Sequence, residues 1–292
     1  MNGPAQPTRR SLLRLSLAGL AATLCPTRLL AAPSTVRIGL TPVILDDQLA
    51  FLGEWRHHLE RGLQRPVEFV QRGSYREIID LTLQDKIQFA WLCGFPYVRH
   101  QKRLRLLAVP VYTGQPLYQA YLIVPSADTQ THSLTDLRDR VFAYSDPDSN
   151  SGFLFPNHWL SSHGHRPESH FRRSFFTYSH RHVIEAVASR LAHGGSVDGY
   201  VWDTLLRSHP ELVLRTRIIE RSPPFGFPPL VAAPGTPANL FRLVQEVLLT
   251  MQDSGRGRHL LDRLALDRFE TGTPALFAGI AQMAGIRGAS GA

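Results

Sequence analysis

Short apolar segments with strand composition alternate with amphipathic segments of helical spacing along most of the chain. In the first part, strands are expected at 36–40, 66–70, 87–92 and 104–111, with helices between them. This rhythm predicts parallel strands whose connecting helices cover the faces of a sheet. A chain of 292 residues is long enough for two such units.

The same rhythm starts again near residue 118 and then stops at a proline-rich stretch. The second set of expected strands is 118–124, 141–144, 175–178 and 197–202. Four prolines then occur within the nine residues 221–229, which is typical of a stiff extended connector. A further strand at 230–233 and apolar helices complete the chain.

Two extended connectors, near 110–118 and 221–229, predict a two-lobed α/β protein with a ligand cleft between the lobes. We expect lobe 1 to comprise residues 35–112 and 228–292, and lobe 2 to comprise residues 113–227. Ligands of open α/β sheets bind beyond the carboxyl ends of the strands, where helices begin. Closure of the lobes about the connectors is the expected functional motion.

The first 34 residues have the organisation of an export signal. Arg9 and Arg10 precede an apolar run at 15–24, and small residues follow at 31–34. The paired arginines followed by Ser-Leu-Leu resemble a twin-arginine signal. The apolar run is too short to span a bilayer. We therefore expect cleavage near 32–34 and a periplasmic mature protein without stable membrane insertion.

Cysteines and charge narrow the function classes further. Lipidation at Cys25 is disfavoured by the bulky Leu24 before it, and cleavage would leave Cys93 as the only thiol. One thiol forms neither a disulfide framework nor a thiolate zinc site. Four arginines and no acidic residue occur in 1–34, so the net charge of +8 is much reduced in the mature chain. A nucleic-acid partner is therefore not expected.

Polar residues recur where strands give way to helices. Unsatisfied backbone N–H groups and partial positive charge make a helix start a binding place for anions. Each junction alone is typical of an ordinary helix cap, but four in one topological position favour an anion site. The four junctions are Gly73-Ser74-Tyr75, Cys93-Gly94, Ser149-Asn150-Ser151-Gly152 and Ser179-His180.

One of these junctions carries a family signature. The stretch Asp146-Pro147-Asp148-Ser149-Asn150-Ser151-Gly152, with Pro156 downstream, resembles the Asp-Pro-x-Ser-x-Ser-Gly motif of PhnD-type proteins. These are periplasmic solute-binding components of ABC transporters for phosphate, phosphite and phosphonates. The resemblance extends over nearly all of the mature chain. It implies a type II periplasmic binding protein fold that delivers a small tetrahedral oxyanion to a membrane permease.

The resemblance also assigns site residues. It implies that Ser149, Asn150 and Ser151 hold the oxygens of the ligand, and that Gly152 permits close approach of the backbone. Thr commonly stands in the family where this chain has Asn150. Members that bind aminoalkyl phosphonates carry acidic residues shortly after the segment that matches Val197-Asp198. Only Asp203 remains there, so an aminophosphonate is less expected. The further ligand-binding residues implied or suggested are Ser74, Tyr75, Cys93, Gly94, Tyr118, His180 and Asp203.

Cys93 leaves a second role open. A helix start lowers the pKa of a thiol, and a thiolate prefers soft partners to hard oxyanions. AioX-like arsenite sensors, relatives of the PhnD type, resemble this arrangement in using a cleft cysteine and in signalling to a membrane histidine kinase. The alternative interpretation is a small buried cysteine packed beside Gly94 and Pro96.

Two other function classes are disfavoured by the sequence. Ser151, His180 and Asp203 contain the groups of a serine hydrolase, but the motif lacks the glycine two residues before the serine. A histidine metal site would draw on His163, His165, His180 and His182, without carboxylate or thiolate partners at ligand spacing. The expectation is therefore a monomeric binding protein without enzymatic activity or cofactor.

Overall fold

The computed structural model describes residue 3, residues 34–42 and residues 49–286. The chain divides into two units, residues 1–33 and residues 34–292, and all the helices and strands described belong to the second. The expected export signal therefore falls almost entirely outside the described residues. No helix among those described is long and apolar enough to cross a bilayer.

One half of this unit, which we call the first half, is built on a six-stranded mixed sheet with strands from both ends of the chain. Its strand order is β13-β4-β12-β3-β1-β2. Strand β1 pairs in parallel with β2 and β3, whereas β12 runs antiparallel to β3 and β4, and β13 antiparallel to β4. The strands are β1 (Val36–Leu40), β2 (Val67–Gln71), β3 (Phe89–Trp91), β4 (Arg105–Val111), β12 (Leu230–Ala232) and β13 (Arg268–Glu270).

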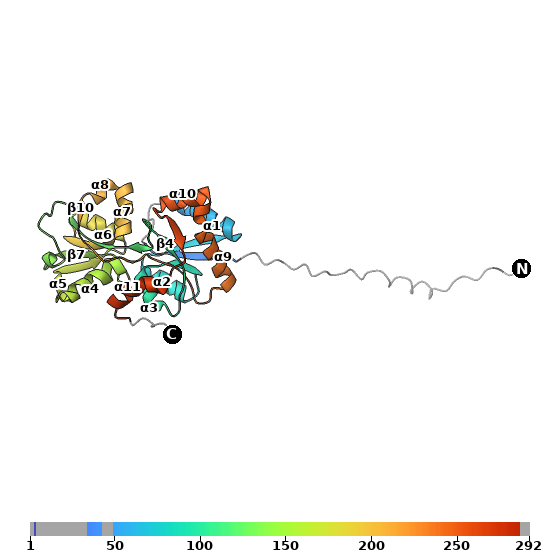
Figure 1. The fold of residues 1–292 in the computed structure, drawn as a ribbon, viewed down its shortest axis with the longest axis horizontal. Coiled ribbons are helices and arrows are strands. Elements are labelled where there is room, and N and C mark those ends of the chain that lie inside the picture. The colour runs from blue at the N-terminus through green and yellow to red at the C-terminus, as the bar shows by residue number, and fades with distance from the viewer. Residues whose placement is uncertain (1–2, 4–33, 43–48, 287–292) are drawn as a thin grey trace. The chain divides into compact units, whose positions relative to one another are not determined.

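Helices gather around this sheet, as Figure 1 shows. Helix α1 buries Phe51, Trp55 and Leu59 at helical spacing and exposes His57. Trp55 packs edge-on against Trp91 of β3, with ring centroids 5.8 Å apart. The helices are α1 (Leu49–Leu63), α2 (Tyr75–Leu83), α3 (Gly94–His100), α9 (Ala238–Leu249), α10 (Gly255–Arg263) and α11 (Ala278–Met283), with short 3₁₀ turns at Met251–Asp253 (η3) and Pro274–Phe277 (η4).

The second half is built on a five-stranded sheet in the order β10-β6-β9-β7-β8. Strand β7 is parallel to β8 and β9, whereas β6 is antiparallel to β9 and β10. The strands are β6 (Ala120–Pro125), β7 (Val141–Tyr144), β8 (Arg173–Phe176), β9 (Gly194–Asp198) and β10 (Thr216–Arg221). The helical elements are η1 (Thr135–Leu137), η2 (Asn150–Leu154), α4 (Phe155–Ser162), α5 (Pro167–His170), α6 (His180–Ala188), α7 (Gly199–Ser208) and α8 (Pro210–Val213).

The chain crosses between the two sheets twice, after β4 and after β10. The crossing segments pair with each other: β5 (Leu117–Tyr118) and β11 (Phe225–Gly226) form a two-stranded antiparallel sheet. The extended connectors expected from the sequence therefore exist and lie side by side. The predicted α/β architecture with two sheet-based halves is confirmed.

Two local expectations are wrong. The sheets are mixed rather than parallel, because each receives the strand that follows a crossing, β12 or β6, in the antiparallel sense. The strand expected at 197–202 ends at Asp198. The Asp198 carboxylate accepts a hydrogen bond from the Tyr200 N–H at 2.9 Å and so caps α7, which begins at Gly199.

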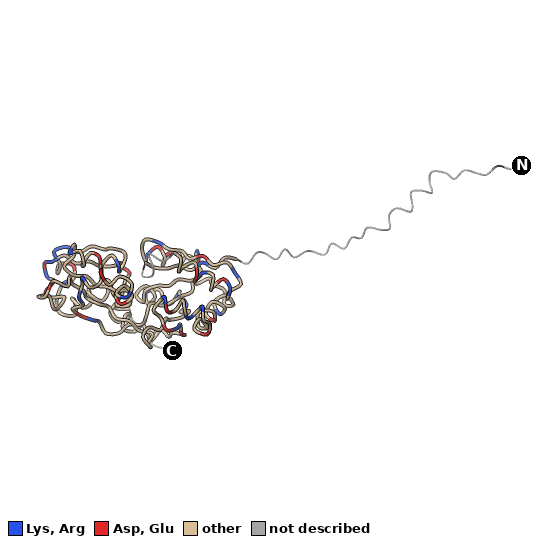
Figure 2. The backbone as a smooth tube through the Cα atoms, turned by 90° about the horizontal axis from the view of Figure 1, so that it is seen from above, with Lys and Arg blue, Asp and Glu red and all other residues tan. Residues whose placement is uncertain are grey.

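Charged residues are mixed in sign over both halves of the described unit, as the coloured trace in Figure 2 shows. A nucleic-acid surface would instead gather lysines and arginines on one face or along one helix. This mixed charge distribution agrees with the weak net charge expected after cleavage of the export signal.

Candidate functional site

Seven polar side chains from both halves converge in the interior, and we call them the polar cluster. All are at most 3% exposed, although six of them end in a hydroxyl, a thiol, an imidazole or a carboxyl group that prefers water. They come from helix starts, strand ends and one connector strand. The cluster consists of Tyr75, Cys93, Tyr118, Asn150, Ser151, His180 and Asp198.

The serine motif enters the cluster on an unusual turn. Ser149 caps η2, a π-helical turn, by accepting a hydrogen bond from the Gly152 N–H at 2.9 Å. The Leu154 N–H bonds the Ser149 carbonyl five residues back, and α4 continues from there. A π turn leaves one more N–H unpaired at its start than an α turn, and such turns are frequent at functional sites.

Gly152 is required by the packing of this turn. A Cβ at this position would lie 1.8 Å from the Ser145 Oγ atom, so no other residue fits without moving the strand end. The glycine expected to allow close approach therefore allows approach of the protein's own Ser145.

Three buried polar atoms of this region have no hydrogen-bond partner among the described residues. They are the hydroxyl oxygens of Ser145 and Ser151 and the amide oxygen of Asn150. Buried polar atoms are nearly always paired, so a group of three is the pattern expected where a ligand completes the bonding.

Asn150 links the serine motif to the first half of the unit. Its backbone N–H donates to the Cys93 sulfur at 3.2 Å, and its side-chain Nδ2 donates to the Tyr118 hydroxyl at 2.9 Å. The Tyr118 hydroxyl accepts that bond and keeps its own proton for another acceptor.

The protonation of His180 follows from its partners. The Asp198 backbone N–H donates to Nδ1 at 3.0 Å, so Nδ1 carries no proton. Nε2 must then carry the proton of the neutral ring, and it lies 3.2 Å from the Tyr75 hydroxyl. Burial lowers the pKa of His180 to about 3, so the ring is neutral at ordinary pH. The Tyr75 proton remains available to a ligand.

The acidic and phenolic members of the cluster are shifted toward their protonated forms. Burial raises the pKa of Asp198 to about 8, aided slightly by the Asp203 charge and opposed by N–H groups of Tyr200 and Val201. Burial also raises the pKa values of Tyr75 and Tyr118 well above 10. The cluster therefore presents hydroxyl and carboxyl protons near neutral pH.

For Cys93, the expected lowering of the thiol pKa is wrong. Burial raises the pKa of Cys93 to about 11 and outweighs the opposing hydrogen bonds from N–H groups of Asn150, Phe95 and Gly94. The sulfur is inside the cluster, but as a thiol that accepts a hydrogen bond.

Besides Ser149 and Gly152 of the motif turn, three residues expected at the site lie outside the cluster. Ser74 caps α2, accepting from the Glu77 N–H at 3.4 Å and donating to the Glu77 carboxylate at 2.9 Å. Gly94 packs against α11, where a Cβ would lie 2.5 Å from the Ile280 side chain. The Asp203 carboxylate accepts hydrogen bonds from two tyrosine hydroxyls, of Tyr112 and Tyr121, each at 3.0 Å.

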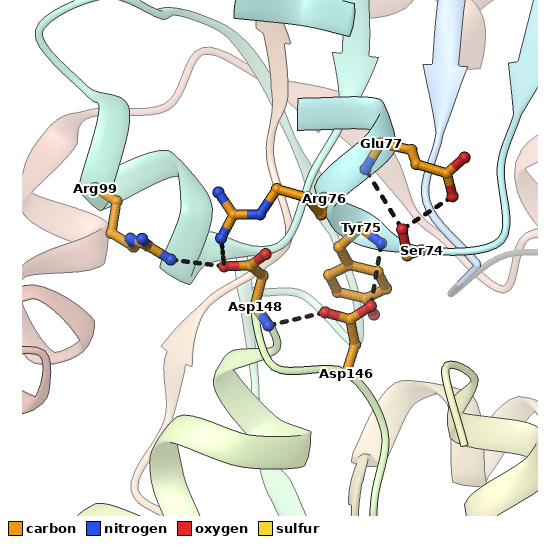
Figure 3. A network of polar contacts seen from close by, with 7 residues as sticks. All are labelled: Ser74, Tyr75, Arg76, Glu77, Arg99, Asp146 and Asp148. Carbon is orange, nitrogen blue, oxygen red and sulfur yellow. Dashed lines mark hydrogen bonds and ion pairs between the residues drawn. The ribbon is translucent and has the colours of Figure 1, made fainter. Parts of the chain in front are cut away.

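Two acidic residues before the serines make contacts that sequence reasoning missed (Figure 3). Asp148, 3% exposed, pairs with Arg99 of α3 at 2.6 Å and with Arg76 of α2 at 3.1 Å. Asp146 accepts from the Tyr75 N–H at 3.1 Å and from the Asp148 N–H at 2.8 Å. These contacts join the serine-motif loop to the start of α2 and the end of α3. The signal available in the sequence was the pair of acidic residues in Asp146-Pro147-Asp148.

The arrangement does not suit a serine hydrolase. In the catalytic triad of a serine hydrolase, the Nδ1–H of the histidine donates to a carboxylate. Here Nδ1 of His180 accepts from a backbone N–H, and Asp203 is bound by tyrosines. In the described parts of the chain, no three His, Cys, Asp or Glu residues are placed to hold a metal ion.

The family follows from a comparison with protein-family models. Residues 38–277 match the model described as the periplasmic substrate-binding protein of phosphonate ABC transporters. The chain belongs to this family. Its characterised members are binding proteins, and the PhnD-type resemblance noted in the sequence is confirmed.

Curated relatives and solved structures agree with the family. The chain is 28% identical over 165 residues to the phosphonates-binding periplasmic protein of Escherichia coli, a match covering 54% of this chain and 48% of the relative. It is 30% identical over 111 residues to the phosphate-import protein PhnD of Mycolicibacterium smegmatis, covering 36% and 35%. The matched segments thus span about half, or less, of these relatives.

The fold is shared with PhnD1 of Prochlorococcus marinus, solved in complex with methylphosphonate. The TM-score is 0.77 at 18% identity, covering 86% of this chain and 97% of the other. The type II periplasmic binding protein fold is therefore confirmed.

Proposed function

We propose that the protein captures a small tetrahedral oxyanion (phosphate, phosphite or a phosphonate) between its two halves and delivers it to an ABC transporter permease. One observation carries the proposal: the Ser145 and Ser151 hydroxyls are buried without hydrogen-bond partners among the described residues, and the Tyr75 and Tyr118 hydroxyls keep their protons for a further acceptor. Neutral donors from both halves and from the connector strand β5 suit an anion with several oxygens. Relatives that carry phosphonate and phosphate in their names support the ligand class.

The setting of this function follows the sequence expectations. The protein acts as a monomer in the periplasm after export by the twin-arginine route and removal of residues 1–34. Residues 35–112 and 228–292 form lobe 1, and residues 113–227 form lobe 2. The lobes close over the ligand by bending at the paired connectors, without catalysis or a cofactor.

Calorimetric titration of the mature protein with phosphate, phosphite and methylphosphonate tests the proposal. We expect one site per chain for at least one of the three. Absence of binding by all three would refute it.

A second role is favoured by the position of Cys93 inside the cluster, with its sulfur bonded to the motif's own backbone. In this role the protein would bind arsenite through the thiol and signal to a membrane histidine kinase. The raised thiol pKa weighs against it. Tight arsenite binding that Cys93→Ser abolishes, without binding of phosphorus oxyanions, would select this role.

A further inference from the structure

Among the described residues, no positively charged side chain belongs to the polar cluster. His180 is neutral, and Arg76 and Arg99, which both bind Asp148, have side chains that are 50% and 37% exposed and so lie outside the buried cluster. The titratable groups facing the cluster from the elements packed around it are Tyr75 and Arg76 (α2), Cys93 and Arg99 (the start and end of α3), Tyr118 (β5), Asp146 and Asp148 (the loop after β7), His180 (α6), Asp198 (β9) and Asp203 (α7).

The lack of a buried positive charge in the cluster limits the negative charge that a bound ligand can carry. Burying an ion without a counter-charge is costly, and a buried group sheds its charge by taking up a proton where it can. The start of the η2–α4 helix offers only a partial positive charge. Acidic side chains are close by, so each additional negative charge on the ligand is opposed. A monoanion is favoured over a dianion.

A second observation points to a proton on the ligand itself. The Asn150 amide oxygen is fully buried, has no partner and can only accept a hydrogen bond. A fully ionised oxyanion has no proton to give it and would leave the amide oxygen unsatisfied, at a cost typical of a buried orphan. A ligand P–OH group would satisfy it.

Taking the proposed function as its basis, we infer that the site selects the singly charged form of a phosphorus oxyanion, which always carries a P–OH group, and that the Asn150 amide oxygen receives a proton of the ligand. Asn150 is then a specificity-determining residue. Sulfate, which has the same shape but no proton at neutral pH, is rejected. Phosphonates, phosphite and phosphate are accepted in their singly charged forms.

Titration calorimetry of the mature protein across pH 5.5 to 8.5 tests the inference, with phosphate, methylphosphonate and sulfate as probes. Above the second ionisation of each phosphorus ligand, affinity should fall about tenfold per pH unit, because only the singly charged form binds. Repeating the titration in buffers of different ionisation enthalpy should show uptake of one proton per ligand in that range. Sulfate should bind at least a hundredfold more weakly than phosphate.

Asn150→Thr provides the matched variant. A threonine hydroxyl can donate as well as accept, so the pH dependence should flatten and the phosphate-to-sulfate ratio should fall by about tenfold. Asn157→Thr is the control, because Asn157 also bonds a tyrosine hydroxyl, that of Tyr144 at 3.0 Å, but lies outside the cluster. It should keep the wild-type profile.

The outcomes separate the two proposals. Affinity for phosphorus oxyanions that is constant or rises above neutral pH, or sulfate binding equal to phosphate, would overturn the inference and leave the proposed function standing. An unchanged pH profile in Asn150→Thr would overturn the role of the amide oxygen. Failure of all phosphorus oxyanions at every pH would overturn the inference together with the proposed function.

Discussion

Replacing Asp148 with asparagine should weaken ligand binding without touching the polar cluster. Its carboxylate is 4% exposed and holds Arg99 and Arg76 of the opposite half, whose side chains are 37% and 50% exposed. A hydrogen bond between charged groups contributes about 1.5–3 kcal/mol when buried, and an exposed ion pair about 0.2–1 kcal/mol. With half-exposed arginines, the two contacts together stabilise the closed form by about 1.5–2 kcal/mol.

This stabilisation converts directly into affinity when the closed form is the one that binds. A loss of about 1.4 kcal/mol is a factor of ten, so Asp148→Asn should raise the apparent Kd by about tenfold to thirtyfold. Calorimetry with the tightest phosphorus oxyanion measures the Kd, and small-angle scattering of the ligand-free protein should show a larger radius of gyration. Added salt should weaken binding more in the wild type than in the variant.

Glu68→Gln is the matched control for this change. Glu68 pairs with Arg37 at 2.9 Å within the first sheet. Its neutralisation therefore removes an ion pair that lies within one half and does not connect the two. It should leave Kd and radius unchanged. If Asp148→Asn also left both unchanged, the contacts of Asp148 would not stabilise the closed form and the reasoning would fail.

Three further predictions concern the cluster. Ser151→Ala should weaken oxyanion binding by about 1.5–3 kcal/mol in calorimetry while leaving the unfolding midpoint unchanged, because the hydroxyl has no hydrogen-bond partner among the described residues; an unchanged affinity would place the ligand elsewhere. The folded-state pKa of Asp198, about 8, exceeds its ordinary value of 3.8, so the folded protein holds a proton that the unfolded chain has released. Stability should therefore fall by about 1–2 kcal/mol from about pH 6.5 to pH 8 in urea unfolding, and Asp198→Asn, which can still cap α7, should abolish that fall. Cys93 should resist alkylation in the native protein, since its thiol is buried and its pKa is raised to about 11; rapid labelling at pH 7 would contradict this.

Local patterns in the sequence were enough for most of the architecture. Helix α1 and strands β1 and β7 are where apolar periodicity places them, because a buried face imposes its spacing on the residues. The antiparallel insertion of β12 and β6 was not predictable in this way, since strand direction depends on where the chain returns after a crossing. Short strands such as β13 carry too few residues to show a period.

The site was predictable by residue type but not by contact. Helix-start polarity identified Tyr75, Asn150, Ser151 and His180, all of which meet in the cluster. Ser74 and Asp203 are also polar residues near helix starts. Ser74, however, caps its own helix, and the Asp203 carboxylate is bound by tyrosine hydroxyls. Such choices between local and long-range partners are made by tertiary packing. The thiol pKa of Cys93 was misjudged for a related reason, because desolvation depends on burial that no local motif reveals.

The turn at 150–154 makes the number of residues in the motif as important as their identity. Because each helical residue advances the side chain by about 100°, removing one residue there would convert the wide turn into an ordinary one and move Asn150 out of register with its partners Tyr118 and Cys93. Deletion of one residue in this stretch would therefore abolish ligand binding even if every functional group were retained. Homologues that differ in length at this point should be suspected of having a different cargo.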